Sequence, residues 1–264
     1  MNAAREYPAG KTSSRALWEI KARRYPLPFD LQNLARTNRV MALLKEWGVG
    51  CAGGARILDI GCGTGCFALP LARKAARVVG VDFSAAVLDR LKAEAARFRI
   101  HNVQVQRMAW QEVDPVRLGL AGAFDVVWTS MSAAVRSAAD LARMEQCSRR
   151  WCVYTGWGRV RENPLLAEAF GIHGLVFGPP PGVAAMHAMV SRAGRQIFLE
   201  YLDTSWDWEG SVDEALDDLA GHIEAGGATA KRHALQRLLD GYQRNGMIRH
   251  ITRAEEGVMA WQIG

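Results

Sequence analysis

Apolar residues recur along the chain in two alternating patterns, which predict strands and helices in turn. Short apolar runs bounded by turn residues are typical of buried parallel strands, whereas apolar side chains three or four residues apart are typical of amphipathic helices. The clearest helical pattern covers Ser84–Phe98, and Ser84 can act as its N-cap. Such alternation predicts a doubly wound α/β sheet joined by right-handed crossovers. The first five predicted strands are Arg56–Ile60, Arg77–Val81, Val103–Arg107, Phe124–Thr129 and Trp151–Thr155.

Two helices are predicted ahead of the first strand. Arg15–Tyr25 has one apolar side and is ended by the prolines that follow it, and Leu31–Trp47 has the same periodicity. We therefore expect residues 1–50 to form an N-terminal helical segment. Residues 51–264 are expected to form the domain that contains the sheet.

The alternation breaks after Gly156, where an insertion of about residues 157–195 is expected. It holds a stiff proline-rich loop between two helical stretches, and later strands complete a mostly parallel sheet of seven strands. The elements predicted beyond Gly156 are the helices Asn163–Phe170, Val212–Glu224 and Ala230–Tyr242 and strand material at Gln196–Trp208, Ile248–Thr252 and Val258–Ile263.

Composition places the chain among compact soluble proteins. Its 264 residues are 49% hydrophobic and 23% charged, close to the globular average. No stretch reaches the roughly 20 uninterrupted apolar residues of a membrane helix, and the N-terminus lacks the apolar core of a secretory signal. We therefore expect a cytoplasmic protein with no membrane partner, whose five cysteines are reduced thiols.

The net charge of +6 and the pI near 9.3 raise the question of an anionic partner such as nucleic acid. Basic residues come as singles and pairs such as Arg149-Arg150, and no run of five occurs. This distribution favours an ordinary solvated surface, so a nucleic-acid partner is not expected.

A glycine-rich turn follows the first predicted strand directly. Gly61, Gly63 and Gly65 alternate with other residues after a buried strand and before a helix. Glycines let the backbone approach a ligand closely, and a helix N-terminus presents free N–H groups. Asp82, seventeen residues after Gly65, ends the second strand, where an acidic side chain is typical of ribose binding. Together these features predict a ligand that contains adenosine.

The sequence disfavours a dinucleotide as this ligand. A G-x-G-x-x-G fingerprint that begins at Gly61 requires glycine at position 66, where the chain has Cys66. Asp59, two residues before Gly61, would repel a dianionic pyrophosphate but would attract a cation.

The stretch Asp59–Gly65, together with Asp82, resembles the first two motifs of the class I S-adenosylmethionine-dependent methyltransferases, and the likeness covers about residues 56–155. The segment Leu17–Tyr25 is similar to the leading helix of the small-molecule branch, which folds over the cofactor as a lid. The resemblance implies a Rossmann-like fold and S-adenosylmethionine as cofactor. For the glycine loop, the resemblance implies that Asp59 and Gly61 lie near the methionine amino group and that Cys62, Gly63 and Gly65 pass under the cofactor. For the turn after the second strand, it implies that Asp82 accepts from both ribose hydroxyls and that Phe83 lies against adenine.

Two further positions follow from the same resemblance. Relatives hold the adenine amino group with an acidic residue after the third strand, where this chain offers Trp110 or Gln111. The fourth strand ends at Thr129, which is expected beside the cofactor. No Asn-Pro-Pro-Tyr follows it, which disfavours the enzymes that methylate amino groups of DNA and glutamine.

Three residues are candidates for catalytic contact with a methyl acceptor. They are Tyr25 in the lid, Tyr154 at the end of the fifth strand and His173 as a general base. Each also has a plainer interpretation as a packing or surface residue. Trp206 and Trp208 alternate with polar residues and so share one face of a strand, which is more often core than a substrate cage.

Paired cysteines also raise the question of a metal site. Cys62 and Cys66 are four residues apart and Cys147 and Cys152 five apart, spacings that a metal site would tolerate. The first pair occupies variable positions of the glycine motif, so no metal is predicted.

The leading hypothesis is in-line transfer of a methyl group from S-adenosylmethionine to a small molecule. The alternatives are an RNA methyltransferase, which would bind RNA in a salt-sensitive manner, and a cofactor-binding sensor without catalysis. A homodimer is compatible with the sequence.

Overall fold

The computed structural model describes residues 25–263, which divide into two compact units with separate cores. The larger unit contains residues 25–156, 182–201 and 257–263. The smaller unit contains residues 157–181 and 202–256. The predicted helix Arg15–Tyr25 and the lid it was to form lie outside the described residues, apart from Tyr25 itself.

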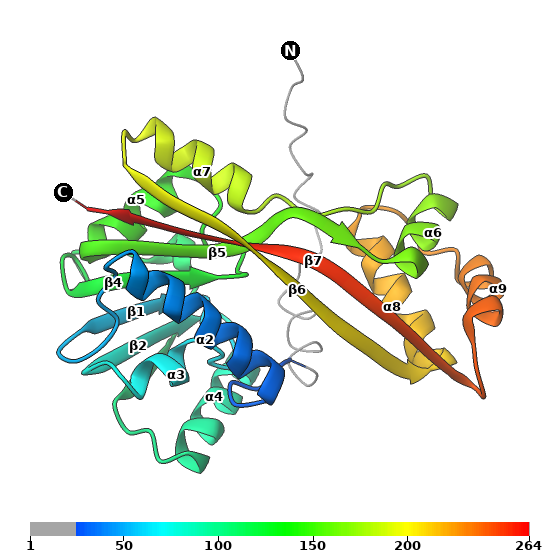
Figure 1. The fold of residues 1–264 in the computed structure, drawn as a ribbon, viewed down its shortest axis with the longest axis horizontal. Coiled ribbons are helices and arrows are strands. Elements are labelled where there is room, and N and C mark those ends of the chain that lie inside the picture. The colour runs from blue at the N-terminus through cyan, green and yellow to red at the C-terminus, as the bar shows by residue number, and fades with distance from the viewer. Residues whose placement is uncertain (1–24, 264) are drawn as a thin grey trace. The chain divides into compact units, whose positions relative to one another are not determined.

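Seven strands of the described chain form a single sheet (Figure 1). In chain order they are β1 (Arg56–Ile60), β2 (Arg77–Asp82), β3 (Val103–Arg107), β4 (Phe124–Ser130), β5 (Ser148–Glu162), β6 (Ile197–Ser211) and β7 (Met247–Gln262). They lie in the order β3-β2-β1-β4-β5-β7-β6, and the pairs from β3 to β5 are parallel. β7 runs antiparallel to its neighbour β5 (Figure 1). The mostly parallel, doubly wound sheet predicted from the sequence is confirmed.

The strand order reverses at β1, which lies between β2 and β4. Crossover helices leave in opposite directions from such a point, so the carboxyl ends of the central strands border a crevice. The glycine-rich turn follows β1 at this edge of the sheet, and Asp82 ends β2 beside it. The topology therefore brings the two predicted ligand motifs together.

Helices of the larger unit cover the sheet and bury its side chains. Val127 packs with Met144 and Met186 in one cluster, whereas the next residue, Trp128, packs on Phe67 with ring centroids 4.8 Å apart. Successive strand residues point to opposite faces, so both faces of β4 are buried. The helices of this unit are α2 (Leu31–Glu46), α3 (Ala68–Ala72), α4 (Ala85–Arg97), α5 (Ala138–Cys147) and α7 (Val183–Arg192).

The smaller unit has its own apolar core between three helices. Two of its helices have side-chain caps, because Asn163 accepts from the Leu166 N–H and Ser211 forms a capping box with Glu214. The helices are α6 (Pro164–Ile172), α8 (Val212–Ala225) and α9 (Arg232–Tyr242), and their buried side chains include Leu165, Leu166, Phe170, Leu219, Ile223, Leu235 and Leu239. The expected insertion of residues 157–195 overlaps this unit only in part.

β5 and β7 are both longer than the sequence predicted. β5 continues beyond Thr155 to Glu162, and β7 is one strand where two were expected. Polar and glycine residues in these stretches hid the strands. Their pairing is held by Arg159, whose backbone and guanidinium both donate to the Glu255 carboxylate at 3.0–3.1 Å.

No helix among residues 25–263 is long and apolar enough to cross a membrane. All five cysteines fall within the described residues and are free thiols.

Candidate cofactor site

The turn after β1 is shaped by its glycines. Gly61, Gly63 and Gly65 have φ angles of 71°, 53° and 89°, in the left-handed region that glycine adopts without strain. Position 61 has a second requirement, since a Cβ atom there would lie 2.0 Å from the Ser132 Oγ. The Gly61 N–H donates to the Val81 carbonyl at 2.7 Å, which ties the turn to the end of β2. The loop is therefore a preformed backbone surface at the carboxyl edge of the sheet.

Asp82 is held over this turn by backbone groups. Its Oδ2 accepts from the Gly63 N–H at 3.0 Å and its Oδ1 from the Ser84 N–H at 2.9 Å. These two bonds orient the carboxylate over the turn. The arrangement suits a ligand that brings hydroxyl donors.

Asp59 lies beneath the turn and is 2% exposed. Burial and then the nearby Asp82 carboxylate together raise its pKa to about 7, against the lowering effect of a hydrogen bond from the Ala68 backbone. Two carboxyl groups in one buried place repel each other as anions. A cationic ligand beside them would relieve that repulsion.

Tyr25 lies close to the same site. Burial raises the pKa of its phenol well above the usual value, and the charges of Asp82 and then Cys66 act in the same direction. The structure therefore places this predicted acceptor-side residue within electrostatic reach of Asp82.

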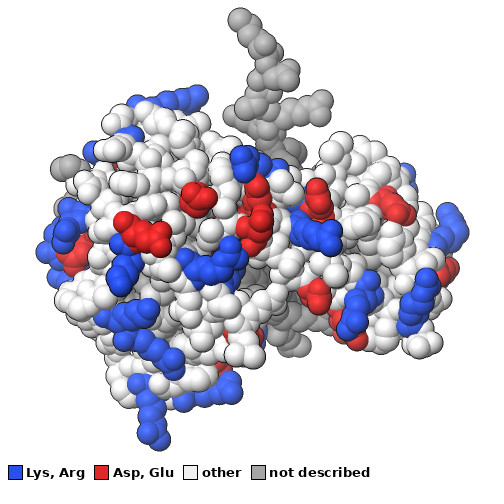
Figure 2. Space-filling model, in the orientation of Figure 1, with Lys and Arg blue, Asp and Glu red and all other residues white. Residues whose placement is uncertain are grey.

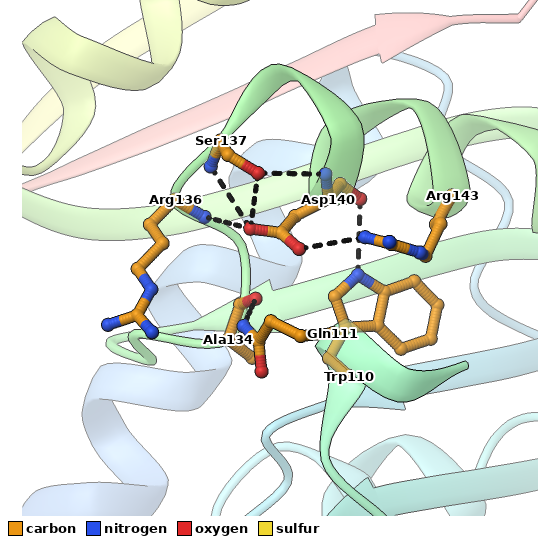
Figure 3. A network of polar contacts seen from close by, with 7 residues as sticks. All are labelled: Trp110, Gln111, Ala134, Arg136, Ser137, Asp140 and Arg143. Atoms are coloured by element: carbon orange, nitrogen blue, oxygen red, sulfur yellow. Dashed lines mark hydrogen bonds and ion pairs between the residues drawn. The ribbon is translucent and has the colours of Figure 1, made fainter.

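The loops after β3 and β4 are joined by polar contacts (Figure 3). The Trp110 ring is 2% exposed, and its indole N–H donates to the Asp140 carbonyl at 3.1 Å. This geometry argues against Trp110 as an adenine ligand, because its only donor is already used. Gln111 is exposed, and its Nε2 donates to the Ala134 carbonyl at 2.8 Å, which directs its other amide atom, Oε1, elsewhere.

The Asp140 carboxylate anchors this second loop. It accepts from the Ser137 hydroxyl at 2.7 Å and pairs with Arg143 at 3.0 Å, and Ser137 caps α5 in return. Figure 3 shows Arg136 approaching the same carboxylate through its backbone N–H. The 134–140 loop is thus fixed by its own helix cap.

Thr129 is fully buried on β4, in register with Ile60 of β1 and Tyr154 of β5. Its Oγ1 has no hydrogen-bond partner among residues 25–263. An orphaned buried hydroxyl costs about 1–3 kcal/mol, and such groups are concentrated at functional sites.

Cys62 is buried against Gly80, where a Cβ atom would lie 2.8 Å from the Cys62 Sγ. Phe83 is half-buried, and its carbonyl accepts a hydrogen bond from Arg107 at 3.2 Å.

His173 does not have the geometry of a general base. Its Nδ1 lies 2.7 Å from the Ala169 carbonyl, and its Nε2 accepts from the Lys231 N–H at 2.9 Å. Both ring nitrogens are committed to backbone groups, which fixes one neutral tautomer. The hypothesis that His173 removes a proton is therefore wrong for this conformation, and the residue links α6 to the start of α9.

Tyr154 is also more buried than an acceptor contact requires. It is 6% exposed within the core of the larger unit, and burial raises its pKa to about 12. Its phenol folds back on Gly156, where a Cβ atom would be 2.6 Å from the hydroxyl. Packing is the better-supported role.

The two tryptophans of β6 have different neighbours within the smaller unit. Trp206 packs against Trp157 with centroids 6.0 Å apart, whereas Trp208 stacks on His250 at 5.2 Å and 7°. Trp208 also borders the apolar core of that unit. Trp208 therefore has the core role that the sequence favoured.

Sequence reasoning missed Ser132 and Thr64 as residues of the loop. Ser132 contacts Gly61 only because β4 pairs with β1, so no local signal announces it. Thr64, by contrast, is a polar residue between two glycines and is 1% exposed, a placement that the motif itself could have flagged. Within the described chain no group of three or more His, Cys, Asp or Glu is arranged to hold a metal ion.

The features of this edge fit one class of ligand. The turn offers a backbone cradle, Asp82 offers acceptors for hydroxyls, and Asp59 favours positive charge. Residues 57–156 match the family described as a methyltransferase domain. These residues form a methyltransferase domain. The matched residues run from β1 through β4 into β5, and they include the glycine turn and Gln111.

Solved structures share the fold of the methyltransferase domain and its surroundings. A putative methyltransferase of Bacillus halodurans C-125 aligns with a TM-score of 0.56 and 14% identity over 86% of this chain and 98% of that chain. Magnesium protoporphyrin IX methyltransferase (ChlM) of Synechocystis PCC 6803, solved with bound SAH, aligns with a TM-score of 0.54 and 13% identity over 95% of each chain. At these identities the likeness is one of fold.

Curated proteins with similar sequence act on ribosomal RNA. The 23S rRNA (uracil(1939)-C(5))-methyltransferase RlmD of Cronobacter sakazakii is 35% identical over 113 residues, which cover 37% of this chain and 26% of that protein. RlmD of Pseudomonas fluorescens is 34% identical over 87 residues, which cover 33% of this chain and 19% of that protein. The chain spans about a fifth to a quarter of the length of these relatives.

Proposed function

We propose that this protein transfers the methyl group of S-adenosylmethionine to a small-molecule acceptor. The observation that carries the proposal is the Asp82 carboxylate, fixed over the glycine turn by the Gly63 and Ser84 N–H groups beside the buried Asp59. Hydroxyl acceptors next to a site that favours positive charge match a cationic nucleoside.

The residues of the turn have separate roles in this proposal. Asp82 accepts from the ribose hydroxyls and Phe83 lies against adenine, while Asp59 and Gly61 face the methionine amino group. Gln111 holds the adenine amino group in place of an acidic residue, because its nitrogen is already bonded to Ala134 and its oxygen is the atom that can accept. Thr129 supplies a hydroxyl at the end of β4, and Cys62, Gly63 and Gly65 form the floor.

S-adenosylmethionine, when bound, supplies a methyl group on a sulfonium that a nucleophile displaces in line. The protein has to orient the two reactants and exclude water, and orientation alone can contribute about 7–11 kcal/mol. Tyr25 is suited to orient an acceptor, since its raised pKa keeps the phenol protonated as a donor. No proton removal is assigned to His173.

The small-molecule branch is supported by the place of Tyr25, whose half-buried phenol lies within electrostatic reach of Asp82 beside the glycine turn. Two proteins of similar fold are named for small-molecule substrates. One is the magnesium protoporphyrin IX methyltransferase, and the other is a putative sarcosine dimethylglycine methyltransferase of Galdieria sulphuraria with 14% identity. We place the activity in the cytoplasm.

The test separates cofactor binding from acceptor choice. Isothermal calorimetry should show binding of S-adenosylhomocysteine and none of NAD. The enzyme is then incubated with methyl-labelled S-adenosylmethionine and a cell extract, and the label is divided by ultrafiltration into low-mass and RNA fractions. Label in the low-mass fraction supports the proposal. Binding of NAD in place of S-adenosylhomocysteine would overturn it.

A second candidate is methylation of RNA, which the RlmD relatives favour. The match spans 37% of this chain, so it leaves most of the acceptor-binding surface without a counterpart. On the face that Figure 2 shows, Lys and Arg side chains are interspersed with Asp and Glu and form no continuous basic patch. Label in the RNA fraction, with affinity that falls steeply as salt rises, would favour this candidate.

A further inference from the structure

Thr64 occupies the middle of the glycine turn but does not face solvent. Its side chain is 1% exposed, and its hydroxyl donates to the Pro26 carbonyl at 2.7 Å. This contact crosses 38 positions of sequence and joins the turn to the segment ahead of α2. This short O–H···O bond is part-buried, because Thr64 is buried whereas Pro26 is exposed, and it is a specific attachment of the segment to the turn.

Cys66 contacts the same carbonyl from the other end of the turn. Its Sγ lies 3.5 Å from the Pro26 oxygen and 3.7 Å from the Thr64 hydroxyl. The Cys66 carbonyl in turn accepts from Thr37 of α2 at 3.2 Å. The Pro26 carbonyl is therefore the point where the turn holds the N-terminal segment.

A second attachment lies three residues farther along. The Phe29 ring packs on Phe98 with centroids 4.2 Å apart, and the Arg73 guanidinium lies 4.2 Å from the centre of the same ring. With Pro26 and Phe29 both attached, the stretch between them has little freedom. Proline fixes one of the backbone angles at Pro26.

Tyr25 immediately precedes the first attachment point. Tyr25 is half-buried and its phenol lies within electrostatic reach of Asp82 and Cys66, and the carbonyl that Thr64 holds belongs to the residue next to it. A shift of Pro26 would move Tyr25 directly.

We infer that Thr64 is a positioning residue, which fastens Pro26 to the glycine turn and thereby fixes the place of the adjacent Tyr25 near the Asp82 end of the cofactor site. This inference rests on the proposed function, since it takes the ligand of the turn to be S-adenosylmethionine. Thr64 itself touches neither reacting group, so its effect on the ligand passes through Tyr25.

The experiment is a double-mutant cycle on binding of S-adenosylhomocysteine, measured by calorimetry. Thr64→Val removes the hydroxyl at nearly constant volume, and Thr64→Ser is the matched control that keeps the donor. We expect Thr64→Val to weaken binding about tenfold, which corresponds to the loss of one part-buried hydrogen bond, and Thr64→Ser to change it less than about twofold.

The decisive comparison uses Tyr25→Ala as background. If Thr64 acts through Tyr25, then adding Thr64→Val to Tyr25→Ala should weaken binding by less than about twofold. The same tenfold loss in both backgrounds would overturn the inference, as would wild-type affinity in Thr64→Val. Circular dichroism confirms folding, and Thr64→Ala replaces the valine variant if the latter does not fold.

Failure of the inference and of the proposed function give different results. Wild-type protein that binds S-adenosylhomocysteine while the cycle shows no coupling overturns the role of Thr64 alone. Wild-type protein that binds no S-adenosylhomocysteine overturns both.

Discussion

Asp59 and Asp82 flank the same glycine turn but lie in different surroundings. Asp82 is half-buried and accepts from two backbone N–H groups, which stabilise its anion. Asp59 is 2% exposed, and burial raises its pKa to about 7. Asp82 is thus anchored by backbone donors, whereas the raised pKa of Asp59 brings its change of charge close to neutral pH.

Replacing Asp82 tests whether its carboxylate accepts hydrogen bonds from the ligand. Asp82→Ala should weaken S-adenosylhomocysteine binding by roughly one to two orders of magnitude, because hydrogen bonds to a charged group are worth about 1.5–3 kcal/mol. Asp89→Ala is the matched control, since Asp89 is an exposed acid of α4 paired with Lys92. Calorimetry that finds Asp82→Ala folded and binding as tightly as wild type would remove Asp82 from the site.

The ionisation of Asp59 should make cofactor affinity depend on pH. The methionine amino group that Asp59 faces in our proposal stays mostly protonated up to about pH 7.5, and the ionised form of Asp59 attracts it. Because burial and Asp82 hold the pKa of Asp59 at about 7, affinity should rise about tenfold between pH 5.5 and 7.5. Binding measured across this range should be nearly flat in Asp59→Asn.

Stability of the ligand-free protein should move in the opposite direction. The pKa of Asp59 is raised from 3.8 to about 7 on folding, so between these values the folded state binds more protons than the unfolded state. The free energy of unfolding therefore falls as pH rises through this window. Urea unfolding that gives Asp59→Asn and wild type the same pH slope would contradict the raised pKa.

At the scale of elements, the sequence predicted what local pattern determines. The α4 helix lies within one residue of the predicted Ser84–Phe98 at each end, since amphipathic period and start signal agree. β7 was divided in two because Arg253–Gly257 in its middle is polar. Its strand character comes from pairing, which local pattern does not carry.

The candidate site shows the same division. The glycines, Asp59 and Asp82 lie in two short motifs, and the fold brings them together as expected. Trp110 and His173 were assigned from type and position, but their hydrogen bonds go to the distant Asp140 and Lys231. Only the tertiary structure reveals that these donors and acceptors are already used.

His173 now predicts an effect on stability rather than on catalysis. His173→Ala removes the contacts to Ala169 and Lys231, and each hydrogen bond contributes about 0.5–1.5 kcal/mol net. We expect a loss of about 1–3 kcal/mol in urea unfolding with S-adenosylhomocysteine affinity unchanged. His187→Ala is the control, since His187 is a partly exposed residue of α7. A large fall in methyl transfer by folded His173→Ala would restore the catalytic hypothesis.

At the scale of the whole molecule, the cofactor features and the second core belong to different units. The glycine turn, Asp59, Asp82 and Gln111 lie in the larger unit, and the smaller unit is packed from α6, α8 and α9. Separate cores permit each unit to open independently. A ligand of the turn should therefore stabilise the larger unit selectively.

Hydrogen exchange with and without S-adenosylhomocysteine tests this selectivity. A ligand at about a hundredfold over its dissociation constant stabilises the folded state that binds it by roughly 2.7 kcal/mol. Amide protons that exchange only when the larger unit opens should therefore exchange about a hundredfold more slowly. We expect the slowing in β1, β2 and the 61–66 turn, and unchanged exchange in α8 and α9. Equal slowing in α9 would mean that the two units open together, whereas no slowing at residues 61–66 would mean that the turn does not bind the cofactor.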